Sequence, residues 1–563
     1  MHLKYPEKTV YQMIEAAAGM YPKEPAFDFY GRRTNYREFL SDITAAARGL
    51  ASIGVCFGSR VTICLPNIPQ ALAAFYAVSR LGAAANMLHP LSAEAEIVHA
   101  LDLADSSWII TADMFYEKVR RAADRSGRQT HIVMVRLQDA LPLHLKLPYL
   151  LRAGRKYLGR PDPPDLLWRD MLRKGAGVSL PKVEFEADHT ACILYSGGTT
   201  GTPKGVCLTD MNLNACGLQT REIVQENFRP GLTMLACMPI FHGFGLGINI
   251  HAVLIHGACC ILMPTFNSRS YADMLLKRKP SFIAGVPAIF EALLGNERLK
   301  NADLSFLLGV FCGGDSLPPV LKERVDAFLK ERGASVQVRE GYGLTECVTA
   351  SCLTPRDTWR PGSIGLPFPD MVYDIAPLDR PGSCPTGETG EIVLKGPTVM
   401  QGYLNDEAET ALALRRREDG DLWLYTGDLG RMDADGYVYF LQRIKRVIIT
   451  NGYNVYPSRL EEALDACPEI SLSCVIGVPN PRRGQVVRAY AVLEPGVPQT
   501  AETKEAIMKR LKERVAAYAL PKSIEFRASL PRTLVGKVAY HELEREALAE
   551  ASAGKETIGG RSV

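Results

Sequence analysis

The sequence lacks several features that would each point to a particular class of protein. No apolar run approaches the roughly 20 residues that a membrane-spanning helix needs, because the best one, around 252–263, is interrupted by His256 and Gly257. Residues 1–30 have none of the charged start, apolar block and small-residue cleavage site of a secretory signal. The 14 cysteines include no Cys-x-x-Cys pair, so we expect reduced thiols and a cytoplasmic protein. A membrane channel, a secreted disulfide scaffold and a zinc ribbon are thereby excluded.

Net charge is also nearly absent. The chain has 65 basic and 62 acidic residues, and a formal charge of +3 is too small to indicate nucleic acid as a partner. What is present is an ordinary globular composition, with 47% hydrophobic and 23% charged residues over 563 positions. This composition argues against extensive disorder, and the length predicts more than one domain.

Strand-length apolar runs alternate with helical patterns through most of the chain. Residues 60–65 are β-rich and precede Pro66, and residues 70–81 repeat apolar side chains at helical spacing until Gly82. The alternation recurs between 281 and 312. Strands that alternate with helices predict parallel sheets covered by helices.

The pattern changes twice toward the C-terminus. Between residues 362 and 439 Gly and Pro are frequent and short β-type runs dominate, which predicts a small antiparallel sheet or barrel. After residue 443 a mixed pattern of strands and helices leads to an amphipathic helix expected over 501–519. We therefore predict an α/β protein. Its large N-terminal domain, residues 1–442, would hold two parallel-rich sheets with helices and a small β-barrel, and residues 443–563 would form a small α+β domain.

A basic segment, residues 141–160, stands apart from this organisation. It holds no acidic residue, and Leu and Tyr are interleaved with its charges. One interpretation is a patch that makes weak contact with a membrane surface or an acyl donor, and the other, more common case is a basic surface helix. Its basic side chains are Lys146, Arg152, Arg155, Lys156 and Arg160.

The strongest chemical signal is a Gly- and Thr-rich loop between two β-type runs, 191–194 and 206–208. Glycines let backbone N–H groups converge on one point, hydroxyls add donors and a lysine adds positive charge, which together suit a polyphosphate. A Walker A loop differs, because a Ser or Thr and a helix follow its lysine, whereas Gly205 and a strand follow here. The predicted phosphate-binding residues are Ser196, Gly197, Gly198, Thr199, Thr200, Gly201, Thr202 and Lys204.

This loop and four later motifs resemble those of the adenylate-forming, or AMP-binding, enzyme superfamily, which includes acyl-CoA synthetases. The later motifs are GYGLTE at 341–346, YTGDLG at 425–430, a hinge-like segment at 443–462 and LPRTLVGK at 530–537. The resemblance implies activation of a carboxylic acid by ATP and Mg²⁺ to acyl-AMP, and then transfer of the acyl group to CoA. A medium- or long-chain fatty acid is the leading expected substrate, and an aromatic acid is the next.

The motifs imply roles that also make chemical sense alone. Glu346 is a hard oxygen ligand suited to holding Mg²⁺ against phosphates. By resemblance, Thr345 would donate to the α-phosphate, and Tyr342, followed by Gly343, would stack on adenine. Asp428 would accept both ribose hydroxyls, although locally a turn-capping Asp would be the simpler interpretation.

Two cations complete the implied nucleotide site. Arg443 resembles the arginine that adds a second ribose contact, its alternative being a solvated linker charge. Lys537 resembles the catalytic lysine of the small domain, whose ammonium can bridge the substrate carboxylate and the α-phosphate. The resemblance also implies that the small domain rotates between the two steps, with Lys445 at the hinge and Gly452 beside the thiol arm of CoA.

The acid-binding side is less firmly indicated. His242 corresponds to a family position that borders the carboxylate, so we expect a gating or orienting residue there, with a core histidine as the alternative. The neighbouring glycines 243, 245 and 247 suit either an acyl tunnel or close helix packing. Gly314 and Asp315 resemble a loop that flanks adenine and the acyl pocket, yet a strand-to-helix turn explains them equally well.

Two other functions remain open from sequence. An acyl-AMP ligase would perform the first step and load a separate carrier protein instead of CoA. A non-catalytic nucleotide-binding protein could use the same fold, because a fold alone does not decide function. Intact Lys204, Glu346, Asp428 and Lys537 favour an enzyme.

Overall fold

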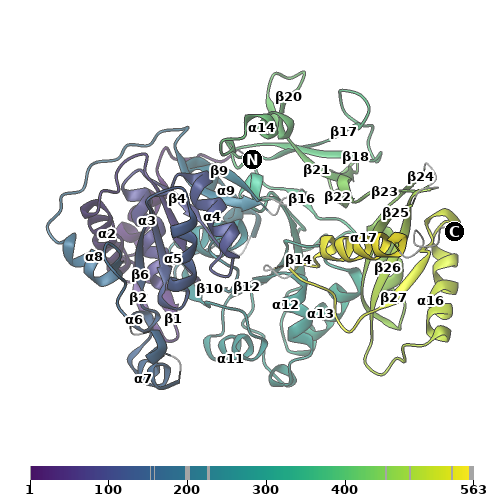
Figure 1. Ribbon diagram of the computed structural model, residues 1–563, viewed down its shortest axis with the longest axis horizontal. Helices are drawn as coiled ribbons and strands as arrows, with labels where there is room; N and C mark the ends of the chain where they lie inside the picture. The colour runs from purple at the N-terminus through teal and green to yellow at the C-terminus, as the bar shows by residue number, and fades with distance from the viewer. Residues whose placement is uncertain are drawn as a thin grey trace.

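The computed structural model of the protein shows a large N-terminal body, with a smaller C-terminal unit packed at one side of it (Figure 1). The residues that the structure describes are 2–152, 154–157, 159–196, 203–224, 228–450, 453–480, 483–533 and 537–556. Within them, no helix combines the length and apolar character needed to cross a bilayer.

The first sheet of the large body is mostly parallel and has the strand order β19-β9-β8-β4-β3-β5-β6-β7. Its antiparallel pair β8–β9 brackets the Gly/Thr loop, as the sequence predicts. The strands are β3 (Arg60–Cys64), β4 (Ala84–Met87), β5 (Trp108–Ala112), β6 (His131–Val135), β7 (Leu166–Leu167), β8 (Thr190–Ser196), β9 (Lys204–Thr209) and β19 (Gly402–Tyr403).

The second sheet has the order β16-β15-β14-β13-β12-β10-β11-β1-β2 and is parallel from β14 to β1. Its strands are β1 (Pro25–Phe29), β2 (Arg32–Asn35), β10 (Thr233–Ala236), β11 (Cys259–Leu262), β12 (Phe282–Gly285), β13 (Gly309–Cys312), β14 (Val338–Tyr342), β15 (Cys352–Leu353) and β16 (Leu366–Pro367). The two parallel-rich sheets expected from the alternating pattern are therefore present.

Helices cover these sheets. The helix predicted over 70–81 is α3 (Pro69–Arg80), and proline is favoured at its first position. One apolar core runs through the whole large body. The other helices are α1 (Val10–Met20), α2 (Tyr36–Ser52), α4 (Glu94–Ala104), α5 (Tyr116–Arg125), α6 (Leu137–Ala140), α7 (Leu143–Arg152), α8 (Trp168–Lys174), α9 (Asp210–Val224), α10 (Ala252–Leu254), α11 (Ser268–Arg278), α12 (Pro287–Leu294) and α13 (Pro319–Glu331).

A third, antiparallel sheet is the small β-unit that the Gly- and Pro-rich stretch predicts. Its order is β17-β18-β21-β20, with β22 also paired to β21. It ends on Arg443, which pairs with Asp428 across β21 and β22. The elements are β17 (Val372–Ala376), β18 (Gly390–Lys395), α14 (Glu407–Ala413), β20 (Leu414–Arg416), β21 (Leu422–Met432) and β22 (Val438–Arg443).

The C-terminal unit has its own sheet, β24-β23-β26-β25 with β27 on β26, and apolar clusters of its own. The helix expected over 501–519 ends at Arg514, because Val515 adopts extended backbone and a short 3₁₀ turn follows. The elements are β23 (Ile448–Thr450), β24 (Tyr453–Val455), α15 (Pro457–Asp465), β25 (Ile470–Asn480), β26 (Gly484–Leu493), α16 (Ala501–Arg514), β27 (Ser523–Phe526) and α17 (Tyr540–Glu556).

Candidate active site

A buried carboxylate lies where the second and third sheets of the large body meet. Asp428 on β21 is 1% exposed, and its Oδ2 accepts a 2.6 Å hydrogen bond from the Tyr342 hydroxyl at the end of β14. Its Oδ1 lies 3.0 Å from Nε of Arg443. Arg443 in turn donates from Nη1 to the backbone oxygen of Thr426 at 3.0 Å. The structure thus joins three of the predicted nucleotide residues directly.

The electrostatics of this cluster explain why the arginine is needed. Burial raises the pKa of the Asp428 carboxyl, and the Arg443 guanidinium and the Tyr342 hydroxyl act in the opposite direction. A carboxylate has about four lone-pair sites, so two oxygens that each hold one partner still have capacity for ribose hydroxyls. The arrangement can therefore accept a diol without losing its internal contacts.

Glu346 is held by a neighbour that the sequence did not indicate. Its Oε1 accepts a 2.9 Å hydrogen bond from the hydroxyl of Tyr403 in β19. The Lys204 ammonium lies 4.7 Å from the centre of the Tyr403 ring and forms an ion pair with Glu409 of α14. Lys204 and Glu346 therefore both contact Tyr403, and Glu409 is the acidic partner of the Lys204 ammonium.

The backbone after Glu346 is strained. Val348 has φ +68° and ψ −56°, and the Thr349 N–H donates to the Cys347 oxygen at 2.9 Å, which makes a tight γ-turn. A β-branched residue rarely adopts this conformation, and such strain persists only where the surroundings enforce it. The turn fixes the direction in which the short 3₁₀ segment Thr345–Cys347 presents Thr345 and Glu346.

The surroundings that enforce the turn come from the segment after His242. A side chain on Gly243 would place Cβ 1.6 Å from the Val348 oxygen, and one on Gly245 would place it 2.0 Å from the Pro239 oxygen. A π-helix, Phe244–His251, follows. Among the described residues, none of the glycines 243, 245 and 247 lines the apolar pocket described below. These glycines allow close packing, while Phe244 and Ile248 of the same segment line the pocket.

Lys537 enters the site from the small domain. Its backbone is held by Thr533, whose N–H donates to the Lys537 oxygen at 2.7 Å and whose Oγ1 accepts from the Lys537 N–H at 3.1 Å. Burial lowers the pKa of its ammonium, and Asp315 foremost, then Asp428 and Glu346, act in the opposite direction. The lysine therefore shares its electrostatic environment with the nucleotide residues.

His242 lies near the same lysine. Burial, and secondarily the Lys537 ammonium, lowers the pKa of its imidazole to about 4. The Phe244 N–H donates to Nδ1 at 3.1 Å, so in the neutral ring the proton is on Nε2. At neutral pH this histidine offers an uncharged N–H donor and no positive charge.

Polar contacts join the small domain to the large body near the site. Arg532 Nη2 lies 3.4 Å from Oε2 of Glu291 on α12. Ser458 of α15 donates to Oε1 of Gln442 at 3.5 Å, the outer limit of a hydrogen bond. These contacts accompany the position in which Lys537 faces the nucleotide cluster.

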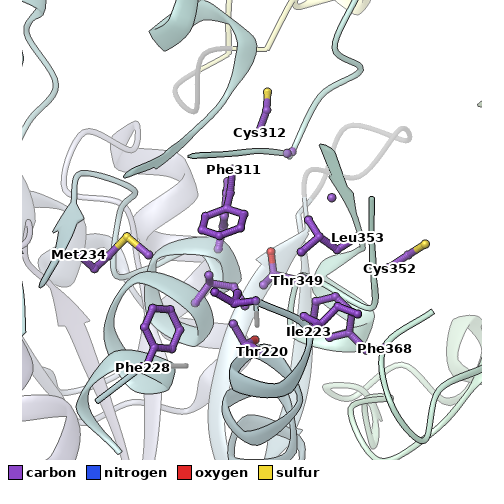
Figure 2. Close-up of a pocket in the computed structure, with 17 residues that line it drawn as sticks. Thr220, Ile223, Phe228, Met234, Phe311, Cys312, Thr349, Cys352, Leu353 and Phe368 are labelled. Carbon is purple, nitrogen blue, oxygen red and sulfur yellow. The ribbon is translucent and has the colours of Figure 1, made fainter. Parts of the chain in front are cut away.

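An apolar pocket adjoins this cluster (Figure 2). Gly313, Gly314 and Gly341 contribute to its wall, and Asp315 and Tyr342 directly follow them in the chain. Its empty volume of about 530 Å³ includes space that is open to solvent. The other lining residues are Thr220, Ile223, Val224, Phe228, Met234, Phe244, Ile248, Phe311, Cys312, Thr349, Ala350, Cys352, Leu353 and Phe368.

The backbone conformation at Gly314 explains why a glycine occupies this part of the pocket wall. Its φ of +82° is a conformation that L side chains rarely adopt, and it brings the backbone beside the pocket. Figure 2 shows the rings of Phe228, Phe311 and Phe368 around the cavity, while the sulfur of Cys312 points away from it. The sequence indicated the glycines but not the aromatic residues, because single Phe residues on separate elements leave no local pattern.

Two parts of the predicted site lie outside the described residues. They are Gly197–Thr202 of the Gly/Thr loop and Gly452 of the small domain. Ser196, at the end of β8, and Gly343, after β14, are described. A Cβ on Gly343 would lie 1.7 Å from the Thr349 oxygen, so this position requires glycine for packing.

Glu346 fits a magnesium ion bound together with phosphates. Mg²⁺ at such sites takes one or two carboxylates, substrate phosphates and water. In the described part of the chain no cluster of three His, Cys, Asp or Glu residues offers an all-protein metal site. The single carboxylate of Glu346 would be the protein ligand of an ion that is otherwise bound by the nucleotide and water.

The chain matches two family models and many known proteins. Residues 14–404 match the model described as AMP-binding enzyme, and residues 459–537 match its C-terminal domain. A long-chain-fatty-acid–CoA ligase of Bacillus subtilis is 34% identical over 552 residues, which cover 97% of this chain and 95% of that protein. A feruloyl-CoA synthase of Amycolatopsis is 32% identical over 531 residues, 94% of this chain and 97% of that protein.

The solved structures agree in fold. ATP-bound MatB from Rhodopseudomonas palustris has a TM-score of 0.82 at 24% identity, and the match covers 96% of this chain and 99% of that one. The fold class predicted from sequence and the resemblance to adenylate-forming enzymes are both confirmed. The chain belongs to the AMP-binding enzyme family.

Proposed function

We propose that the protein is a fatty-acid–CoA ligase. A carboxylate oxygen of the acid attacks the α-phosphorus of ATP and pyrophosphate leaves; the CoA sulfur then attacks the acyl carbon and AMP leaves. The observation that carries the proposal is the apolar pocket whose glycine wall runs directly into Asp315 and Tyr342. An acyl chain in the pocket would present its carboxylate to the charged cluster.

In this proposal the large body binds the nucleotide. Asp428, supported by Arg443, would accept the ribose hydroxyls, and the Tyr342 ring would lie along the adenine. Glu346 would hold Mg²⁺, which supplies positive charge against the phosphates. Ser196, Lys204 and the Gly/Thr loop are the proposed phosphate contacts, and Thr345 faces the α-phosphate.

Lys537 is the proposed catalytic residue of the first step. Two anions must approach each other when carboxylate meets ATP, so neutralisation and positioning account for most of the catalysis. The surrounding carboxylates of Asp315, Asp428 and Glu346 favour the charged ammonium. The neutral Nε2–H of His242 is suited to orienting the acid. The division at residues 442 and 443, and a rotation that brings Gly452 toward CoA, belong to the same proposal.

The pocket lining favours a monocarboxylic acid with an apolar body. Among the described residues, no charged side chain lines the pocket, so a second carboxylate would be buried without a partner. The relative from Bacillus subtilis carries the name of a long-chain-fatty-acid–CoA ligase. An aromatic acid is the second candidate, because four phenylalanines line the pocket and the Amycolatopsis relative is named a feruloyl-CoA synthase.

The test is pyrophosphate release with a panel of acids, followed by mass spectrometry of the thioester. We expect the highest kcat/KM with medium- and long-chain fatty acids, less with aromatic acids and little with dicarboxylic acids. CoA and a carrier protein are offered as acceptors in parallel, and acyl-CoA is the expected product. Absence of pyrophosphate release with every acid, from folded protein, would contradict the proposal, and thioester on the carrier alone would favour an acyl-AMP ligase.

A further inference from the structure

The basic segment 141–160 presents an unusual helix to solvent. In α7, Leu143, Leu147 and Leu151 are 86%, 63% and 62% exposed, and they recur every fourth residue. At 100° per residue they span one narrow stripe of the helix. Single exposed leucines are ordinary on protein surfaces, but three in one stripe form a continuous apolar face that no described element of the chain covers.

The rest of α7 explains how the helix is attached. Leu145 and Tyr149, on the opposite side, are half-buried, as is Leu150 beside the stripe, and no described residue of α7 is fully buried. Figure 1 shows α7 at the lower edge of the large body, far from α16 and α17 of the small domain. The helix is therefore a peripheral element with its apolar stripe turned outward, and the active site does not use it.

Positive charge follows the stripe in the chain. Arg152, Lys156 and Arg160 are exposed, and the segment 141–160 contains no acidic residue. Lys146 lies 3.9 Å from Asp139 and so has a partner within the protein. Exposed leucines on one stripe, followed in the chain by exposed cations, are typical of helices that lie in the interface of an anionic bilayer.

We propose that α7 docks the protein on an anionic lipid bilayer. Leu143, Leu147 and Leu151 enter the boundary between headgroups and acyl chains, while Arg152, Lys156 and Arg160 meet lipid phosphates. The helix lies on the surface and does not span it. A second copy of the chain fits the same stripe less well, because pairing two such faces would bring like charges together without acidic partners.

The test is co-sedimentation of the full-length protein with vesicles. Vesicles that contain phosphatidylglycerol should bind it, vesicles of phosphatidylcholine alone should bind at least about tenfold less, and added salt should weaken the binding. Replacing all three stripe leucines, Leu143→Ser, Leu147→Ser and Leu151→Ser, should lower binding more than about tenfold.

A control variant replaces three exposed leucines that lie outside α7. Leu91, Leu378 and Leu412 are 55%, 62% and 58% exposed, and their replacement by Ser should leave vesicle binding unchanged. Circular dichroism and thermal unfolding of both triple variants show whether each is folded. Loss of binding in the control variant as well would overturn the assignment to α7.

The charges are tested in the same way. Arg152→Gln, Lys156→Gln and Arg160→Gln together should remove most of the preference for anionic vesicles. Replacing three exposed basic residues of α16, Lys509→Gln, Lys512→Gln and Arg514→Gln, should not.

Three results would contradict the proposal. They are no binding of the wild-type protein to anionic vesicles, binding by the leucine variant at the wild-type level, and a dimer in solution that the leucine variant converts to monomer. The last result would make the stripe a contact between copies of the chain.

Discussion

The two sides of the candidate active site are built differently. On the large-body side, Tyr342, Asp428 and Arg443 contact one another directly at 2.6 and 3.0 Å, around a carboxylate that is 1% exposed. On the small-domain side, Lys537 is held by hydrogen bonds between its backbone and Thr533, and an interdomain ion pair, Arg532 with Glu291, spans 3.4 Å. Exposed ion pairs of this kind contribute little, about 0–1 kcal/mol.

This difference assigns substrate binding to the large body and the catalytic lysine to the small domain. The nucleotide side is preorganised by the contacts of Asp428 on β21 with Tyr342 on β14 and with Arg443, which lies at the end of β22 on the proposed domain boundary. The lysine is supplied by a unit whose own core is separate, so its presence depends on how that unit is docked. Changes on the large-body side should therefore affect substrate binding, and changes to Lys537 should affect the rate of adenylation.

The largest expected effect is that of Lys537→Ala. Acid-dependent pyrophosphate release should fall about a thousandfold, because a positioned charge at the reacting centre is lost. The dissociation constant of ATP, measured by calorimetry, should change less than about threefold, since the large-body contacts remain. Lys522→Ala, an exposed lysine of the same domain, is the control and should behave as wild type. A Lys537→Ala variant with normal pyrophosphate release would refute the catalytic role.

Asp428→Asn should have the next largest effect, and on the opposite parameter. The amide cannot balance the charge of Arg443 and accepts hydrogen bonds through one atom only, so the KM for ATP should rise about 10- to 100-fold. The kcat at saturating ATP should fall much less. Steady-state kinetics with ATP as the varied substrate separates the two, and an unchanged KM would show that the ribose is bound elsewhere.

Gly243→Ala tests the packing that strains the turn after Glu346. A Cβ only 1.6 Å from the Val348 oxygen forces the two segments apart, so we expect a lower melting temperature and about a tenfold lower kcat. Gly19→Ala in α1 is the matched control, because a Cβ there would meet nothing within 4 Å and alanine favours a helix. Equal stability and activity of Gly243→Ala and wild type would mean that the turn is not enforced by this contact.

His242→Gln should have the smallest effect, and its pH dependence is the informative part. The folded-state pKa of about 4 lies below the ordinary value, so the ring is already neutral throughout the range from about pH 6 to 8. Replacing it by a neutral donor should lower kcat/KM less than about tenfold and leave the shape of the pH–rate profile unchanged in that range. Loss in the variant of a limb that the wild type shows near pH 6.5 would mean that His242 titrates near its ordinary pKa, which would contradict the account.

The sequence predicted most of the fold and the nucleotide side of the site. Alternating strands and helices gave both parallel-rich sheets, and the motifs named Tyr342, Asp428 and Arg443, which the structure brings together. Such residues are recognisable because each lies in a short motif whose glycines and turns leave a local pattern. The expected end of the helix at residue 519 was wrong, since apolar spacing continues through the short 3₁₀ turn after Arg514.

Residues that act through distant partners could not be found in this way. Tyr403, Glu409 and Glu291 reach Glu346, Lys204 and Arg532 across the fold, and nothing in their neighbouring sequence marks them. The strain at Val348 depends on Gly243, about a hundred residues away. The same holds for the stripe of α7, because the composition of the segment favoured a basic surface helix and did not show that its leucines are exposed.

The central claim is that the large body binds the nucleotide and that the small domain brings Lys537 to it. The most direct test is to cross-link the small domain in the position that the structure shows. Glu291→Cys and Arg532→Cys, in a background in which the exposed Cys56 is Ser, are joined by a short bismaleimide, with each single-cysteine variant as a control. The cross-linked protein should form one equivalent of acyl-AMP and pyrophosphate at nearly the normal rate, while acyl-CoA formation falls more than about tenfold. Cross-linked protein that makes acyl-CoA as fast as the controls, or that forms no acyl-AMP, would contradict the account.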